Sequence, residues 1–204
     1  MSEHEHVFAT PGPAGLMVLA FYLGCLWPVA THMVPHDLIV ILVPLGLAGA
    51  IVQTLAGVIE LRNGAILPGN IMMAFSAFMW YGFGEHLLNA LGLIKGSTAG
   101  VDGVVFMIMG LFMVGFTPCF FLKNTAATLF MIATDVFFVD AALFFLTGTP
   151  IFWTIAGWSL PFVIGFIMWQ VIGDIVNTMY GRIIVPMGPP WAARKPGPAS
   201  TIAK

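Results

Sequence analysis

The chain has 204 residues, of which 59% are apolar and only 8% carry a formal charge. A soluble domain carries about a quarter charged residues, so this composition excludes a cytosolic enzyme, a basic nucleic-acid-binding protein and a disordered chain. A mean hydropathy of +0.99 predicts an all-α membrane protein, and the length leaves room for six or seven spans of about 20 residues and for no separate soluble domain.

Long apolar runs predict six transmembrane helices. Backbone groups in hydrocarbon must be hydrogen-bonded internally, and solid apolar runs lack the alternation of barrel strands, so these segments are expected to be helical. The loops between them are short, so consecutive helices should be antiparallel neighbours with both termini on one side. The predicted spans are residues 14–33, 38–61, 71–93, 101–122, 126–146 and 152–180.

The cations are distributed asymmetrically between the two predicted membrane faces. Only Lys95 lies on one face, and the termini and the even-numbered loops carry Arg62, Lys123, Arg182, Arg194, Lys195 and Lys204. The positive-inside rule therefore predicts that both termini are cytoplasmic. The chain divides into a cytoplasmic N-terminal tail (1–13), a six-helix membrane domain (14–185) and a Pro/Gly-rich cytoplasmic tail (186–204), for which disorder is predicted.

Small and aromatic residues mark expected surfaces of the helices. Glycines at positions 46, 49 and 57 of the second span, and at 157, 165 and 173 of the sixth, predict close helix packing. The sequence leaves open whether these contacts lie within one subunit or between subunits. Trp153, near the outer end of the sixth span, is expected in an interfacial aromatic belt rather than against a ligand.

Residues 10–16 read TPGPAGL, and residues 53–64 read QTLAGVIELRNG. They resemble N-P-x-P-L-G-L and Q-x-x-A-G-x-x-E-x-x-x-G, two motifs of the acetate uptake transporter family, the succinate–acetate permeases. The sixth span has AGW at 156–158 and ends GDIVNTMYGRIIVPMG at 173–188, similar to A-G-W and G-E-x-x-N-x-x-F-G-R-x-x-x-P-x-G. The motif positions that we expect to matter are Pro11, Pro13, Gly15, Gly57, Gly157, Trp158, Asp174, Asn177 and Arg182.

The resemblance implies a ring-shaped homohexamer in which each six-helix subunit has its own pore, narrowed by apolar side chains. The constriction then falls on Leu19, where the family has Phe, and on Phe75 and Ala133. At about 1.5 Å per residue, all three lie roughly 6 to 11 Å from the cytoplasmic ends of their helices. Leu19 replaces a bulky Phe and Ala133 replaces a larger apolar residue, so we expect a wider constriction than is usual in the family. The alternative is that all three are ordinary core residues.

The chain also departs from the family pattern. Thr10 replaces the Asn of the first motif, and residues 23–28, LGCLWP, replace a polar N-L-H-N stretch. The resemblance therefore supports the six-helix architecture more directly than it supports acetate as the substrate.

Carboxylates within spans are costly and are functional candidates by default. Asp135 and Asp140 of the fifth span lie about 140° apart around the helix, so they do not share one face. Glu85, His86 and Asp140 fall at a common depth in the outer half, which predicts a His86–Asp140 or a Glu85–His86 pair. Such a pair serves either proton coupling and substrate capture or a structural tie between helices.

Polar residues also gather at the cytoplasmic ends of the second and sixth spans. Gln53, Glu60, Asp174 and Asn177 lie there, near two arginines. A salt-bridged helix boundary is favoured over a polar pore entrance.

No catalytic motif competes with these assignments, and no cofactor, metal site or nucleic-acid partner is predicted. His32, His36 and Asp37 in an outer loop are weak support for a metal. The sequence favours a non-enzymatic prokaryotic inner-membrane transporter or channel for small monocarboxylates, and transport is expected to be proton-linked. A passive channel for ammonium, urea or an amide is the alternative.

Overall fold

A computed structural model of the chain describes residues 9–193; the N-terminal eight residues and residues 194–204, with their three cations, lie outside it. The described chain contains six helices that are long and apolar enough to cross a membrane, which confirms the prediction of six spans. Their bounds are α1 (Gly12–Ala30), α2 (Leu42–Arg62), α3 (Ile66–Ala90), α4 (Ala99–Phe120), α5 (Thr125–Thr147) and α6 (Pro150–Tyr180), with a short 3-10 helix η1 (His36–Ile41) before α2.

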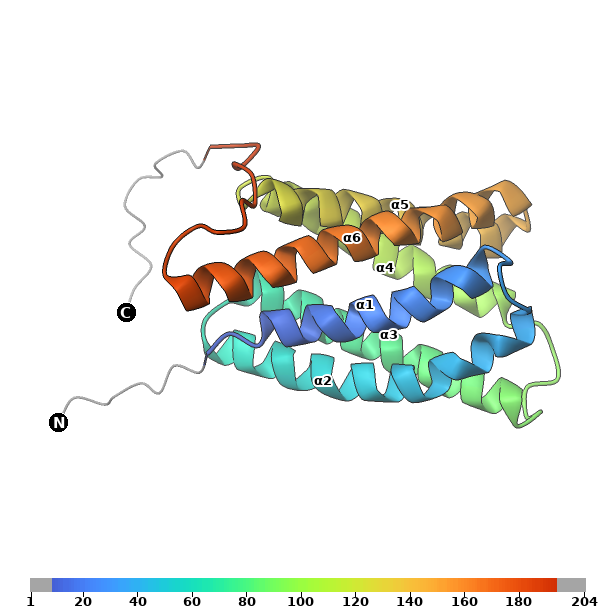
Figure 1. Ribbon diagram of the computed structural model, residues 1–204. Helices are drawn as coiled ribbons and strands as arrows, with labels where there is room; N and C mark the ends of the chain where they lie inside the picture. The colour runs from blue at the N-terminus through green and yellow to red at the C-terminus, as the bar shows by residue number, and fades with distance from the viewer. Residues whose placement is uncertain (1–8, 194–204) are drawn as a thin grey trace, which may run out of the picture.

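The helices form two layers, α1–α2–α3 and α4–α5–α6, which are joined mainly where α1 packs against α6 (Figure 1). Helices α3 and α4 are consecutive in the chain but touch little. The start of α1 and the end of α6 lie at the same end of the bundle, here named the terminal end; the opposite end, with η1, is the distal end (Figure 1).

Local sequence determines where several helices begin and end. The Asn124 side chain accepts a hydrogen bond from the Ala127 backbone N–H (2.8 Å) and caps the start of α5. Pro150 begins α6, where its missing N–H costs nothing. Gly148 and Gly181 end α5 and α6 in the left-handed conformation, at φ +68° and +60°, which is readily adopted only by glycine.

Glycines bring α2 close to α3. A Cβ at Gly46 would lie 3.3 Å from the Phe83 backbone, and a Cβ at Gly57 would lie 3.1 Å from the Gly69 carbonyl oxygen. The prediction of close packing is thus confirmed for α2, within one subunit. In α6, Gly157 approaches the Ala30 carbonyl at the end of α1, but no atom lies near a Cβ built at Gly165, so the α6 row does not form one continuous interface.

The core lies between the two layers and is built of large apolar side chains. Phe137 and Phe138 of α5, Met79 of α3 and Met113 of α4 are almost completely buried there. Leu19 and Phe75, each 2% exposed, belong to the same cluster.

Candidate functional site

A cavity of about 650 Å³ lies between the two layers at the distal end of the bundle. Helices α1, α3, α4, α5 and α6 and the short helix η1 all contribute to its lining. This volume is within the usual range for small-molecule sites. We name it the distal cavity.

One side of the distal cavity carries a cluster of polar groups around Glu85 of α3. The Nδ1 atom of His86 lies 2.7 Å from Glu85 Oε2. The side chains of Asn89 and Thr98 donate hydrogen bonds to Glu85 Oε1, the latter at 3.5 Å. Of the two pairs that the sequence suggested, the structure contains Glu85–His86, while Asp140 lies outside the lining of the cavity.

A second polar pair lies where α3 and α4 diverge. The Tyr81 hydroxyl donates a 2.6 Å hydrogen bond to Asp102 Oδ1. Asp102 is buried in the first turn of α4, and both side chains line the cavity. Sequence reasoning missed both residues; the signal that could have found Asp102 is a carboxylate just inside an apolar run.

The Tyr22 hydroxyl is a polar group without a partner. The Tyr22 side chain is 4% exposed and lines the cavity from α1. Its oxygen would lie 2.8 Å from a Cβ at Gly82, a residue that also lines the cavity. Within residues 9–193 it makes no hydrogen bond, so this hydroxyl, on a largely buried side chain, can donate to or accept from a group in the cavity.

Histidines and one further carboxylate complete the polar lining. His32, His36 and Asp37 come from the α1–α2 connection. The cavity thus has three carboxylates and three histidines, and none of its described lining residues is Lys or Arg. No group of three or more His, Cys, Asp or Glu side chains among the described residues is arranged to hold a metal ion.

The remaining wall of the cavity is aromatic. Phe78, Phe106, Phe145 and Trp153 follow one another across α3, α4, α5 and α6, with neighbouring ring centroids 5.1 to 5.6 Å apart. The interfacial position expected for Trp153 stays a prediction, and the structure adds that Trp153 lines the cavity. Its ring faces the cavity because it packs against Phe144 and Phe145 of the neighbouring helix.

Apolar side chains close the bundle below the distal cavity. Phe138 packs against Phe78 in the cavity wall and against Phe75, with centroids 5.2 and 5.9 Å apart. Leu19 lies one turn of α1 below the cavity-lining residues. The structure therefore places Leu19 and Phe75 in one buried apolar layer.

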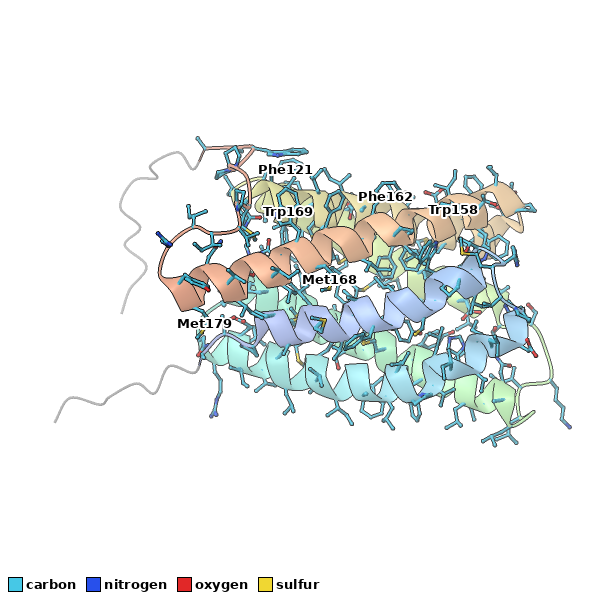
Figure 2. All side chains as sticks on the ribbon, viewed as in Figure 1. Phe121, Trp158, Phe162, Met168, Trp169 and Met179 are labelled. Carbon is cyan, nitrogen blue, oxygen red and sulfur yellow. The ribbon has the colours of Figure 1, made fainter. Side chains whose placement is uncertain are left out.

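Ala133 is placed differently. It lines a separate apolar hollow between α5 and α6, together with Trp158 and the 63% exposed Phe162. Trp158 and Phe162 are labelled in Figure 2. Ala133 packs against the same core cluster as Leu19 and Phe75, but its position on α5 turns it toward α6, and it lines this hollow rather than the distal cavity.

Asp135 lies in the contact between α5 and α4. The Thr117 hydroxyl donates a 2.6 Å hydrogen bond to its Oδ2, and its Oδ1 is buried without a partner among the described residues. Asp140, two-thirds of the way along α5, is half-buried and makes no hydrogen bond within the described chain. Neither carboxylate lines the distal cavity.

The expected salt-bridged boundary at the terminal end is wrong: no ion pair among residues 9–193 joins its arginines to carboxylates. Gln53 instead donates to the Gly15 carbonyl (2.8 Å), and Glu60 accepts from Thr10. Asp174 accepts from Gln170 of its own helix (2.7 Å). Gln53 and Glu60 therefore join α2 to α1 and to the N-terminal segment through hydrogen bonds with uncharged groups.

Lys123, in the α4–α5 turn, interacts electrostatically with two of these carboxylates, Asp174 and Glu60. Its Nζ lies 5.0 Å from the Phe120 ring centroid. Partial removal from solvent lowers the pKa of Lys123, and attraction from Asp174 and Glu60 opposes this shift.

The segment after α6 is held against the bundle up to residue 193, contrary to the disorder predicted for the tail. Asn177 accepts hydrogen bonds from the backbone N–H groups of Ile184 and Val185 (both 2.8 Å) and donates to the Val185 carbonyl. Trp191 stacks on Phe121, at the start of the α4–α5 turn. Phe121 is labelled in Figure 2.

The other motif residues lie at helix ends and helix contacts outside the distal cavity. The Pro11 carbonyl accepts a hydrogen bond from the Gly15 N–H as α1 begins, with Pro13 in its first turn. Trp158 packs edge-on against Trp27 of α1. Arg182 is exposed at the terminal end.

Comparison with known proteins supports the fold assignment. No family model matches the chain, and no curated protein matches it. Among solved structures, the chain is similar to one described as the structure of the bacterial acetate channel SatP, with a TM-score of 0.80 and 21% sequence identity. The alignment covers 89% of this chain and 99% of that one, so the six-helix fold is the fold of that channel.

Proposed function

We propose that the chain is a multi-pass protein of a prokaryotic inner membrane that conducts small monocarboxylic acids such as acetate. In this proposal both termini are cytoplasmic, so the distal cavity opens to the outside. The fold likeness to the bacterial acetate channel and the three sequence motifs support it. The distribution of Lys and Arg supports the orientation.

The observation that carries the mechanism is the apolar layer of Leu19 and Phe75 below a cavity lined by three carboxylates. Removing a neutral polar group from water costs about 2–7 kcal/mol, and removing an ionised carboxylate costs far more. The cavity offers an anion no Lys or Arg among its described residues. The solute therefore passes as the neutral acid, which carries its own proton.

The path runs from the distal cavity past Phe78 and Phe138 to the layer of Leu19 and Phe75. It then reaches Gln53 and Glu60 at the terminal end, which offer hydrogen-bonding groups where the acid regains water. Ala133 takes no part in this path, because it lines the hollow between α5 and α6.

Flux into liposomes tests the function. Purified protein is reconstituted, total acetate is held constant, and internal acidification is followed at several external pH values. We expect protein-dependent flux that rises as pH falls, in proportion to the neutral acid. Protein-free liposomes are an essential control, since acetic acid also crosses lipid unaided.

The carboxylates of the distal cavity also favour a second candidate, a passive channel for a neutral or cationic solute such as ammonium, urea or an amide. The same liposomes distinguish the two. Acetate flux equal to that of protein-free liposomes at every pH, with protein-dependent urea or ammonia flux, would replace the first proposal by the second.

The homohexamer implied by the family resemblance is part of the proposal. Native mass spectrometry of the detergent-solubilised protein measures it directly. A hexamer is expected, and a monomer that persists after gentle release from lipid nanodiscs contradicts it.

A further inference from the structure

We propose that the distal cavity is a binding site for small organic ammonium ions that carry a hydrogen-bonding group. This goes beyond acid conduction, because it assigns a ligand of opposite charge to the cavity. Three observations carry it: the charge of the lining, its aromatic wall and the unpartnered hydroxyl of Tyr22.

The charge of the lining selects a cation. Glu85 and Asp102 lie on opposite sides of the gap between α3 and α4, and Asp37 lies on η1. No Lys or Arg of the described lining neutralises them; Glu85 has His86 beside it, and Asp37 and Asp102 form no ion pair among the described residues. A cation in this cavity interacts with these carboxylates in a partly dehydrated space, where the attraction is stronger than in bulk water.

The aromatic wall selects an organic cation over a small inorganic one. Phe78, Phe106, Phe145 and Trp153 present a connected series of rings to the cavity. Aromatic faces attract alkylammonium groups, whose methyl groups carry the charge and are weakly hydrated. A strongly hydrated metal ion gains little from such a wall, and the described residues form no cluster that could coordinate one.

The Tyr22 hydroxyl selects a second group on the ligand. Tyr22 is 4% exposed, and its oxygen points past Gly82, whose missing side chain leaves it access to the cavity. Buried hydroxyl groups normally have partners. A hydroxyl or carbonyl group of the ligand supplies one.

A matched pair of ligands tests the site without any variant. Choline and 3,3-dimethylbutan-1-ol have the same shape and the same hydroxyl group, but only choline is charged. Calorimetric titration of the full chain in phosphatidylglycerol nanodiscs should give at least about tenfold tighter binding of choline. Equal binding of the two, or binding of neither, overturns the proposal. This binding measurement does not depend on acetate flux. Choline binding can therefore fail while acetate conduction is confirmed, and acetate conduction can fail while choline binding is confirmed.

Variants locate the site. Asp102→Asn and Glu85→Gln should each weaken choline binding by about tenfold and leave the neutral alcohol unaffected. Asp174→Asn, at the terminal end, is the matched control and should bind choline as the wild type does. Tyr22→Phe keeps the ring, so it should weaken choline but not tetramethylammonium, which has no hydroxyl. Unchanged choline affinity in both cavity variants, with normal gel filtration, contradicts the proposal.

A trimethylammonium group can come from a free solute or from a lipid headgroup. Repeating the titration in phosphatidylcholine nanodiscs distinguishes them. Unchanged choline affinity indicates a free solute, and a loss of affinity indicates that the headgroup occupies the same site.

Discussion

The Tyr81 hydroxyl and Asp102 Oδ1, 2.6 Å apart, link α3 to α4 across the distal cavity. These two helices have few other contacts, among them the Phe78–Phe106 ring pair and the hydrogen bond from Thr98, at the start of α4, to Glu85. The Tyr81–Asp102 hydrogen bond is therefore one of a small number of ties between α3 and α4 beside the cavity. It also orients the carboxylate group of Asp102, which lines the cavity.

Tyr81→Phe should destabilise the protein by about 1.5–3 kcal/mol, the usual contribution of a hydrogen bond to a charged group. Denaturant unfolding in mixed micelles measures this. Tyr180→Phe is the matched control, because Tyr180 is 65% exposed at the end of α6 and should be neutral. Equal unfolding midpoints for the two variants would mean that the link between α3 and α4 contributes little.

Asp135→Asn should leave the pH dependence of acetate flux unchanged. Asp135 faces Thr117 on α4 and does not line the distal cavity, and a neutral acid brings its own proton. Proteoliposome flux between pH 5 and 8 measures this.

A flattened pH profile in Asp135→Asn would instead show that this carboxylate carries the proton. Thr117→Val is the companion variant. It removes the hydrogen bond to Asp135 Oδ2 and should lower stability by about 1–3 kcal/mol, with the flux profile retained.

The helices could be predicted from the sequence because their signals are local. Each apolar run is long enough to span a membrane, and the glycines of α2 occur at helical spacing on the face that packs against α3. Predicted and observed ends differ by a few residues, because helix ends fray and apolar composition does not define the terminal turn.

The distal cavity could not be predicted because its residues are distant in sequence. Tyr81 and Asp102 meet only through the angle between α3 and α4, which no local pattern determines. Trp153 has the position of an interfacial residue, and only its packing on Phe144 and Phe145 turns it toward the cavity.

The final segment was mispredicted for a related reason. Its Pro/Gly composition indicates disorder, but residues 184–191 gain hydrogen bonds and a stacked ring from side chains elsewhere. Composition does not contain that information.

Asn177→Ala should release this segment. The variant loses three hydrogen bonds to Ile184 and Val185, two of which satisfy backbone N–H groups. Hydrogen exchange measured by mass spectrometry should show faster exchange in a peptide covering 182–192, with α1 unchanged. Asn70→Ala is the control, since Asn70 is exposed and bonds only its own helix. Protection equal to that of the wild type would contradict the assigned role of Asn177.

Leu19→Phe should narrow the apolar layer and reduce the flux of larger acids more than that of acetate. Leu19 is 2% exposed in the core that contains Phe75, so a larger ring there fills space below the distal cavity. Overpacking should also cost about 1–3 kcal/mol of stability. The butyrate-to-acetate flux ratio is the measurement, because it does not depend on how much protein is reconstituted.

Phe21→Leu is the matched control for Leu19→Phe. Phe21 lies two residues away on the same helix but is 58% exposed on the outside of the bundle, so its replacement should leave the ratio unchanged. Leu19→Ala should raise the ratio, since it opens the same layer. If the ratio is the same in both Leu19 variants as in the wild type, the acid does not pass Leu19, and the path must run elsewhere through the bundle.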